Sequence, residues 1–262
     1  MNERQSLILE ALRTSDQTIR SLAVRHQVAE MTVRRDLKAL GEQADIVISN
    51  GVVRLYDRLH KSSEDVDSGQ ALVRNAIAAA LYHRIFPTET LFVSGGRTTL
   101  AFARYLCSHC TFPVTVVTNS LAIASTLFSE NRTSGSSRMF KIILLGGEFR
   151  TDMMDLMGPV AEKNLREYHV SWLVTGCDAA NPEEGFYSSD LSVSNLERES
   201  VKIADHTAVV TESLKFGRKA LVKFADFSDI DLLVTDDSLD PAVAESLMRH
   251  GLEVIRAGLP KD

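Results

Sequence analysis

The sequence predicts an α/β protein of two parts, a winged helix-turn-helix followed by a larger domain built on a largely parallel sheet. Three observations support this prediction. Helical patterns and an Asn-Gly hairpin signal fill the first 57 residues, apolar content falls over residues 58–69, and β-type runs alternate with helical stretches from residue 70 onward. With 262 residues, 44% of them hydrophobic, the chain is long enough for two such domains and too apolar to be disordered.

The first domain, residues 1–57, is expected to form three helices and a wing. Apolar residues at helical spacing predict helices over residues 4–13, 19–25 and 30–41. Thr18 is suited to cap the second helix, because its side-chain oxygen can accept a hydrogen bond from the first N–H groups of that helix. Two β-branched runs flank Asn50 and Gly51, and Asn-Gly between such runs is a strong hairpin signal.

The second domain, residues 70–262, follows a linker at residues 58–69 and is expected to alternate strands with helices. Apolar runs predict strands at residues 90–93, 114–117, 141–145, 170–175, 207–211 and 231–235. Helical stretches are expected between most of them, at residues 70–84, 98–107, 120–129, 159–168 and 194–205. Residues 131–137 are polar and are expected to form a surface loop.

Charge is distributed unevenly along the chain, whose net charge is −6. Residues 1–60 contain nine Lys and Arg against eight Asp and Glu, whereas the remainder contains twenty against twenty-seven. The acidic remainder should repel a polyanion. Contact with nucleic acid is therefore expected only from a local basic patch in the first 60 residues.

The chain is expected to be cytoplasmic. Three cysteines favour a reducing compartment over a disulfide framework. The N-terminus does not resemble a signal peptide, and no apolar run is long enough for a transmembrane helix. Cys107 and Cys110 have C-x-x-C spacing, but the second pair that a structural zinc site needs is missing, so neither a metal nor a cofactor is expected.

The third predicted helix carries the residues expected to bind DNA. Val33, Leu37 and Leu40 lie on its buried face, which leaves the basic side chains outside. In a winged helix-turn-helix this helix enters the major groove, while the hairpin lies against the backbone or the minor groove. The residues expected to reach phosphates and base edges are Thr18, Thr32, Arg34, Arg35, Lys38 and Asn50. The alternative is a small helical domain with a solvated basic face.

Residues 31–37, Met-Thr-Val-Arg-Arg-Asp-Leu, closely resemble the recognition-helix signature of the DeoR-type family of bacterial sugar-operon repressors. In that family the C-terminal domain senses a phosphorylated sugar or related metabolite and shares a fold with ribose-5-phosphate isomerase. Runs similar to the family's motifs follow in order at residues 96–99, 117–120, 144–147, 158–159, 176–178 and 215–217. The resemblance therefore implies a regulator with a sugar-phosphate sensor.

Several of these loops suit an anion on physical grounds. Residues 95–99 join a predicted strand to a predicted helix, where glycines let backbone N–H groups approach an anion and the helix N-terminus is partly positive. Arg97 adds a guanidinium that suits phosphate. Loops at the carboxyl ends of parallel strands meet in one crevice. The residues expected to bind the effector are Gly95, Gly96, Arg97, Thr98, Thr99, Asn119, Ser120, Gly147, Asp178 and Lys215.

Each loop also has a purely structural interpretation. Glycine and hydroxyl residues are common at strand-to-helix turns, Gly147 could serve only a tight turn, and Lys215 could be a solvated lysine. The remaining loop carboxylates are expected to be mostly solvated charge: Asp152, Asp155, Glu183 and Glu184.

The chain departs from the family pattern at several positions. Ala29 stands where the family usually has a Ser cap, and the wing is less cationic than usual. Ser94 stands in place of a frequent Asp, and Arg97 replaces a Thr. Glu212 and Leu214 replace an Asp and a Ser before the Lys-Phe-Gly run. Together these changes imply an altered effector rather than a different fold.

The function expected from the sequence is that of a DNA-binding transcriptional repressor of a carbohydrate catabolic operon, without catalytic residues. Its expected partners are a double-stranded DNA operator, a phosphorylated sugar or sugar derivative, and further copies of the chain in a dimer or tetramer. Two alternatives remain. One is a sugar-phosphate isomerase-like enzyme with a DNA-binding appendage, for which Asp178 would be the carboxylate base. The other is a regulator whose effector site has decayed.

Overall fold

The computed structural model describes residues 3–14, 17–41, 46–49, 52–55, 68–133 and 139–259. Within it the chain divides into two units, Met1–Ser68 and Gly69–Asp262. Of the predicted linker, residues 58–67 lie outside the described residues, while Ser68 and Gly69 already belong to a helix.

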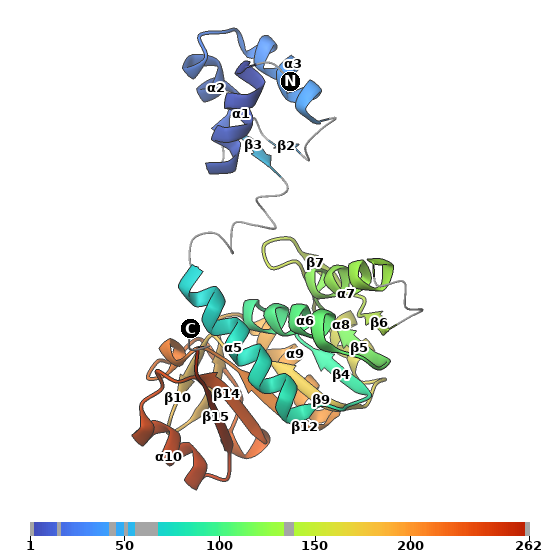
Figure 1. Cartoon of the computed structure of the whole chain (residues 1–262), viewed down its shortest axis with the longest axis vertical. Coiled ribbons are helices and arrows are strands. Elements are labelled where there is room, and N and C mark those ends of the chain that lie inside the picture. Colours follow the sequence, from blue (N-terminus) through green and yellow to red (C-terminus); the bar gives the residue numbers. More distant parts are fainter. Residues whose placement is uncertain are drawn as a thin grey trace. The chain divides into compact units, whose positions relative to one another are not determined.

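The N-terminal unit is a winged helix-turn-helix, as the sequence predicts (Figure 1). Its helices are α1 (Glu3–Thr14), α2 (Ile19–Arg25) and α3 (Glu30–Gly41). Its strands are β1 (Gln17–Thr18), β2 (Ile46–Ser49) and β3 (Val52–Leu55), which pair antiparallel in the order β1-β3-β2. The periodic apolar residues meet in one small core, formed by Ile8, Leu12, Ile19, Leu22, Ala23, Val33, Leu37, Leu40 and Val53.

The turn between α2 and α3 sets where α3 begins. α2 begins at a capping box, in which Thr18 Oγ1 accepts a hydrogen bond from the Ser21 N–H at 2.9 Å. The chain then turns through Gln27, which has a positive φ of 52°. The Thr32 N–H donates to the carbonyl oxygen of Ala29 at 2.9 Å. Ala29 has no side-chain acceptor, so α3 begins without the cap that a Ser would supply.

The C-terminal unit is built on a seven-stranded sheet in the order β15-β14-β12-β9-β4-β5-β6, in which all neighbours are parallel. These strands are β4 (Thr90–Val93), β5 (Val114–Thr118), β6 (Phe140–Leu144), β9 (Val170–Thr175), β12 (Ala204–Val210), β14 (Leu232–Asp236) and β15 (Glu253–Ala257). Six of them lie where the sequence predicts strands. The helices are α5 (Ser68–Ile85), α6 (Arg97–His109), α7 (Leu121–Thr133), α8 (Pro159–Leu165), α9 (Leu191–Lys202) and α10 (Pro241–Arg249). Among the described residues, no helix is both long and apolar enough to cross a membrane.

Helices cover both faces of this sheet (Figure 1). Successive side chains of a strand point to opposite faces. Leu91 and Val93 of β4 therefore pack with α5, α6 and α7, whereas Phe92 packs with α8 and α9. On the same principle, Val209 and Leu233 of β12 and β14 join a third cluster with α10. The sheet is buried on both sides, which explains why its strands read as continuous apolar runs.

The sequence does not predict several short elements. β7 (Glu148–Arg150) and β8 (Asp155–Met157) form an antiparallel hairpin. A separate antiparallel sheet consists of β10 (Ala179–Asn181), β11 (Gly185–Ser188) and β13 (Val222–Ala225). Two 3-10 turns are η1 (Ser213–Lys215) and η2 (Phe227–Asp229). Strands of three or four residues are too short for alternation to be recognised.

Several predicted boundaries are wrong. α8 ends at Leu165 rather than at residue 168, α9 ends at Lys202 rather than at residue 205, and β12 begins at Ala204 rather than at residue 207. α7 continues to Thr133, so residues 131–133 are helical rather than part of a polar loop, and residues 134–138 lie outside the described residues. α9 begins at Leu191 rather than at residue 194, because Asp190 caps it and accepts hydrogen bonds from the N–H groups of Ser192 and Val193 at 2.8 and 3.2 Å.

Candidate functional site

Three basic side chains project from the outer face of α3. Arg34, Arg35 and Lys38 are exposed, and within the described residues no hydrogen bond or ion pair engages them. Of the two acids of the same helix, Glu30 is exposed in the first turn, whereas Asp36 is buried and accepts a hydrogen bond from Arg4 Nε at 2.7 Å. The outer face of α3 is therefore cationic and available to phosphates and base edges.

The other predicted DNA-binding residues are less clearly positioned to contact DNA. Thr18 is exposed, but its hydroxyl oxygen caps α2. Thr32 is half-buried in the first turn of α3, and Asn50 lies outside the described residues. Met31, which the sequence prediction did not include, is 71% exposed at the start of α3. Apolar side chains contact the thymine methyl group in the major groove, so Met31 joins the candidates.

The crevice of the second unit lies where the winding of the sheet reverses. From β4 the chain proceeds through β5 to β6, then crosses to β9 on the other side of β4 and continues toward β15. The switch point is therefore between β4 and β9, where ligands of such sheets bind beyond the carboxyl ends of the strands. Ser94 Oγ donates to Thr175 Oγ1 at 2.9 Å, so the two strand ends are in direct contact.

The turn after β4 presents the N-terminus of α6. Gly96 is the N-cap, and among the described residues no side-chain hydrogen bond caps the helix. Arg97 is exposed in the first turn. Two groups of the turn are already engaged, since the Gly95 N–H donates to Asn119 Oδ1 and Thr99 Oγ1 donates to the Gly96 carbonyl oxygen, both at 3.0 Å. Arg97 and the end of the helix remain available for an anion.

The residues of the next two loops shape this turn. Asn119 and Ser120 follow β5 and are buried, and Asn119 holds Gly95 through its side-chain oxygen. Gly147 follows β6, where a Cβ would lie 2.6 Å from the Met157 carbonyl oxygen. Packing against the β7-β8 hairpin is therefore sufficient reason for glycine at this position.

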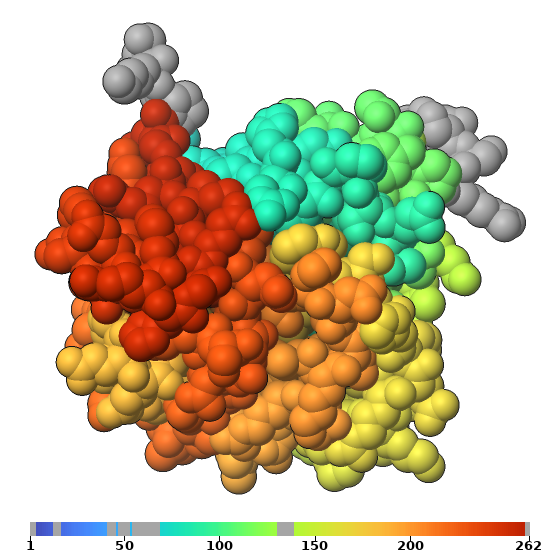
Figure 2. Space-filling view, turned by 90° about the horizontal axis from the view of Figure 1, so that it is seen from below, coloured from blue at the N-terminus to red at the C-terminus, as the bar shows by residue number. Residues whose placement is uncertain are grey.

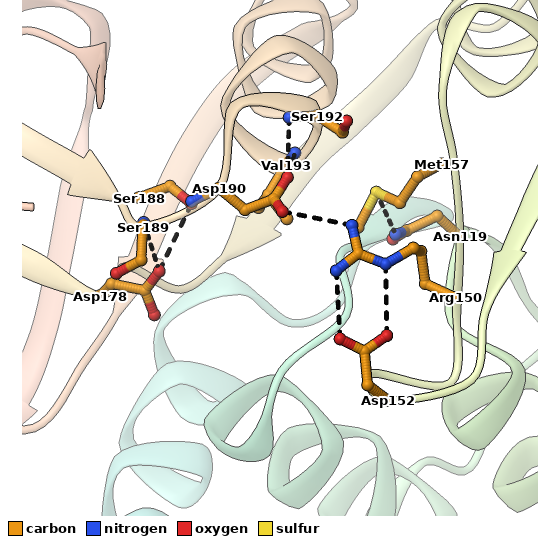
Figure 3. Close-up of polar contacts among 10 residues, drawn as sticks. All are labelled: Asn119, Arg150, Asp152, Met157, Asp178, Ser188, Ser189, Asp190, Ser192 and Val193. Atoms are coloured by element: carbon orange, nitrogen blue, oxygen red, sulfur yellow. Dashed lines mark hydrogen bonds and ion pairs between the residues drawn. The ribbon is translucent and has the colours of Figure 1, made fainter. Parts of the chain in front are cut away.

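The segments that carry Asp178 and Lys215 lie side by side on the far side of the switch point, where a β-bridge joins Ala180 and Phe216. Asp178 follows β9, is exposed, and accepts a hydrogen bond from the Ser189 N–H at 2.7 Å (Figure 3). Burial raises the pKa of the neighbouring Cys177 thiol to about 12, while the charge of Lys215 acts in the opposite direction. The ammonium of Lys215 therefore lies within electrostatic reach of the chain segment that carries Asp178.

Arg150, which the sequence prediction also did not include, joins two elements at the rim (Figure 3). Its guanidinium lies 3.1 Å from Asp152 of the same hairpin and 3.2 Å from Asp190, the N-cap of α9. The ion pairs thus tie the β7-β8 hairpin to α9. No sequence pattern marks this contact, because Arg150 and Asp190 are far apart in the chain.

Two buried carboxylates lie beneath the crevice loops. Asp155 is 4% exposed, so the prediction that it is solvated is wrong. A Cβ on Gly95 would lie 2.1 Å from its Oδ2. Burial raises the pKa of Asp155 to about 6, against the effect of a hydrogen bond from Ser120. Glu197 of α9 accepts a hydrogen bond from Thr175 Oγ1 at 2.6 Å, and burial raises its pKa to about 7.

A separate hollow of about 500 Å³ lies at the opposite, amino-terminal edge of the sheet. Its lining includes Arg84, Trp172, His206 and Glu253. The teal, yellow, orange and red segments that supply its lining meet on the face shown in Figure 2. None of the predicted effector residues lines this hollow, so it is distinct from the crevice between β4 and β9.

Comparison with known families covers both units. Residues 4–57 match the DeoR-like helix-turn-helix domain, and residues 70–237 match the DeoR C-terminal sensor domain. The putative aga operon transcriptional repressor of Escherichia coli O157:H7 is 28% identical over 262 residues, covering 98% of this chain and 94% of that protein. The HTH-type transcriptional regulator GlpR of Haloferax volcanii is 27% identical over 266 residues, covering 97% of this chain and 96% of that protein.

Similarity to solved structures is weaker. Ribose 5-phosphate isomerase A from Methanocaldococcus jannaschii is 13% identical, with a TM-score of 0.41 over 57% of this chain and 55% of that chain. A chain of the tetrameric eIF2B-beta2-delta2 complex from C. thermophilum is 12% identical, with a TM-score of 0.45 over 66% of this chain and 58% of that chain. Such TM-scores support no conclusion about function. The two family matches cover most of the chain, and they establish that it belongs to the DeoR family of transcriptional regulators.

Proposed function

We propose that the protein represses a carbohydrate catabolic operon and that a phosphorylated sugar or sugar derivative changes its affinity for operator DNA. The main observation behind this proposal is that the chain has two separate surfaces suited to binding an anion. One is the unpaired basic face of α3, and the other is the uncapped N-terminus of α6 at the switch point of the sheet. The E. coli relative is named as a repressor of the aga operon, which agrees with this role.

On DNA, we assign α3 to the major groove. Arg34, Arg35 and Lys38 contact phosphates and base edges, while Met31 and Thr32 lie at the end of α3 that reads the bases in such domains. Thr18 supports this surface by capping α2. The wing residue Asn50 is assigned to the DNA backbone or the minor groove.

In the sensor domain, we assign the phosphate group to the N-terminus of α6, with Gly96, Arg97 and Thr98 as its surroundings. The polyol end of the effector then lies toward Asp178 and Lys215, whose carboxylate and ammonium can accept and donate hydrogen bonds to hydroxyl groups. The remaining predicted effector residues shape the loops through the contacts described above: Gly95, Thr99, Asn119, Ser120 and Gly147.

We infer binding without turnover in this crevice. Enediol chemistry needs a carboxylate base beside the substrate carbon. Asp155 and Glu197 are buried beneath the loops, and Asp178 already holds the turn at Ser189. We also infer a homo-oligomer, a dimer or a tetramer, because a two-fold dimer doubles the DNA contact that a single helix-turn-helix can make.

The test uses the full chain in two steps. Operator duplexes are first selected by the protein from a random pool, and a panel of sugar phosphates is then titrated into the complex while operator release and turnover are followed. We expect one phosphorylated sugar to change operator affinity without being converted. Conversion of a sugar phosphate would instead support the isomerase-like enzyme. Operator binding that no member of the panel alters would support a decayed effector site.

A further inference from the structure

Asp155 places a carboxylate beneath the turn to which the anion is assigned. Its two oxygens lie 2.1 and 2.3 Å from the position that a Cβ of Gly95 would take. A β-bridge between Ser120 and Asp155 fixes this end of β8 against the segment that follows β5. The carboxylate is therefore a fixed part of the floor of the crevice.

The surroundings of Asp155 disfavour a negative charge. Its Oδ1 is buried and has no hydrogen-bond partner among the described residues. An ionised carboxylate in a poorly hydrated place is costly unless donors satisfy its oxygens. The raised pKa of Asp155, about 6, agrees with this geometry and places the loss of its proton close to neutral pH.

The charged groups around Asp155 do not stabilise its ionised form. Asp152 in the hairpin and Glu197 on α9 both interact with it as like charges. Arg150 lies opposite Asp155 in the β7-β8 ladder, but its guanidinium is directed to two other carboxylates. On the β4-α6 turn, Arg97 is exposed rather than packed into the floor.

We propose that the sensor domain takes up a proton together with its anionic effector, and that Asp155 is the group that accepts it. The inference rests on the proposed function, which places the anion on the same turn. An anion at the N-terminus of α6 and an ionised Asp155 beneath it would repel each other where water is scarce, so the complex keeps the carboxyl neutral.

The direction of the pH dependence follows from linkage. The bound anion raises the pKa of Asp155 above its value of about 6 in the free protein. The affinity for an anion of fixed charge is therefore highest below that value, falls as the pH rises through it, and levels off only above the pKa of the complex.

Sulfate is the probe for this proposal. It stays doubly charged between about pH 5 and about pH 8, whereas a phosphate ester itself titrates near pH 6 and would mask the protein's proton. Sulfate affinity is measured by calorimetry for the parent, for Asp155→Asn and for Glu148→Gln, which removes an exposed carboxylate from the same hairpin. Parent and control should lose up to about tenfold in affinity per pH unit above about pH 6. Asp155→Asn should bind sulfate equally at every pH and more tightly than the parent at about pH 8.

Proton uptake can also be read without a variant. Titrations of the parent in two buffers with different heats of ionisation should show close to one proton bound per sulfate near neutral pH. Uptake near zero overturns the proposal. A pH dependence that persists unchanged in Asp155→Asn also overturns it.

A further variant separates this inference from the proposed function. Arg97→Ala should weaken sulfate binding at every pH, because Arg97 lies on the assigned anion turn. If Arg97→Ala binds sulfate as tightly as the parent, the anion lies elsewhere and the proposed effector site fails, taking the proton uptake with it. Sulfate binding that Arg97→Ala weakens but that does not depend on pH overturns only the role of Asp155.

Discussion

Arg74 and Glu212 form a buried ion pair, with 3.2 Å between Nη1 and Oε1 and both side chains 6% exposed. Arg74 belongs to α5, the helix that opens the second unit, and Glu212 directly precedes the turn that carries Lys215. The pair therefore connects the loop that carries Lys215 to the helix nearest in sequence to the N-terminal unit. Glu212, one of the departures from the family pattern, thus has a definite structural partner.

Removing one partner of this pair should strongly destabilise the second unit. Glu212→Ala leaves the Arg74 guanidinium buried without its acid, and breaking a buried pair in this way costs about 3–5 kcal/mol. Glu212→Gln keeps the size and a hydrogen-bond acceptor and should cost less. Urea unfolding of the parent and both variants measures the difference. A Glu212→Ala variant within about 1 kcal/mol of the parent, as for an exposed pair, would contradict this expectation.

The contact between Gly95 and Asp155 predicts that a substitution at one position can restore stability lost by a substitution at the other. Gly95→Ala places a Cβ 2.1 Å from Asp155 Oδ2, so it should destabilise the protein by about 1–3 kcal/mol through overpacking. Asp155→Ala removes the obstructing carboxylate, and the double variant should recover part of that loss. A double-mutant cycle from urea unfolding tests this, and strictly additive effects would show that the two positions are not in contact.

The N-cap of α9 predicts a stability that depends on pH. The hydrogen bond from the Val193 N–H, with further contributions from Arg150 and the Ser192 N–H, holds the pKa of Asp190 below its usual value of 3.8. Such a carboxylate stabilises the fold above the unfolded-state pKa, and its contribution is lost as the pH falls through the lower folded-state pKa. Asp190→Ala should therefore cost about 0.5–2 kcal/mol at neutral pH.

The difference in unfolding free energy between Asp190→Ala and the parent should shrink as the pH falls below about 4, because the parent then loses the charged cap as well. Asp190→Asn, which keeps a capping oxygen, is the matched control and should lose less at neutral pH. Denaturant unfolding at neutral pH and near pH 3 gives the comparison. A difference that stays constant across this range would mean that the charge of Asp190 does not contribute.

The basic face of α3 predicts a salt effect on DNA binding. Arg34→Ala and Arg35→Ala should each weaken operator binding, and each lost phosphate contact should flatten the slope of log affinity against log salt by about one unit. Arg249→Ala, an exposed arginine of α10 in the second unit, is the control and should leave the slope unchanged. If both α3 variants bind operator as tightly as the parent at physiological salt, α3 is not the recognition helix.

The helices and strands with a regular spacing of apolar residues could be predicted from sequence, because that spacing indicates which face of an element is buried. Leu91, Phe92 and Val93 form an apolar run, and the structure buries that strand on both faces. The hairpin of β7 and β8 has strands of three residues, which carry no period. Its pairing depends instead on contacts with the segment after β5, such as the Leu156 N–H with the Asn119 carbonyl oxygen.

The site was predicted less completely than the fold, for a related reason. The glycine turn at residues 95–96 is marked by its own residues, so it could be placed between a strand and a helix. Asp155 has the same local sequence character as a solvated loop acid, and its burial arises only when Gly95 and Ser120, from the loops after two other strands, meet it. Arg150 likewise depends on Asp190, a partner 40 residues away. The sequence shows which residues are charged, but which of them form ion pairs depends on the fold.

The measurement that tests the account most directly is effector-driven release of operator by the parent and by Arg97→Ala, followed by fluorescence anisotropy. Losing one charge-assisted hydrogen bond costs about 1.5–3 kcal/mol, so the effector midpoint of Arg97→Ala should rise about 10- to 150-fold. Operator affinity without effector should not change, because Arg97 lies in the sensor domain and the residues that we assign to DNA lie in the N-terminal unit. Equal effector midpoints for the two proteins would contradict the assignment of the α6 N-terminus as the site through which a phosphorylated effector controls DNA binding.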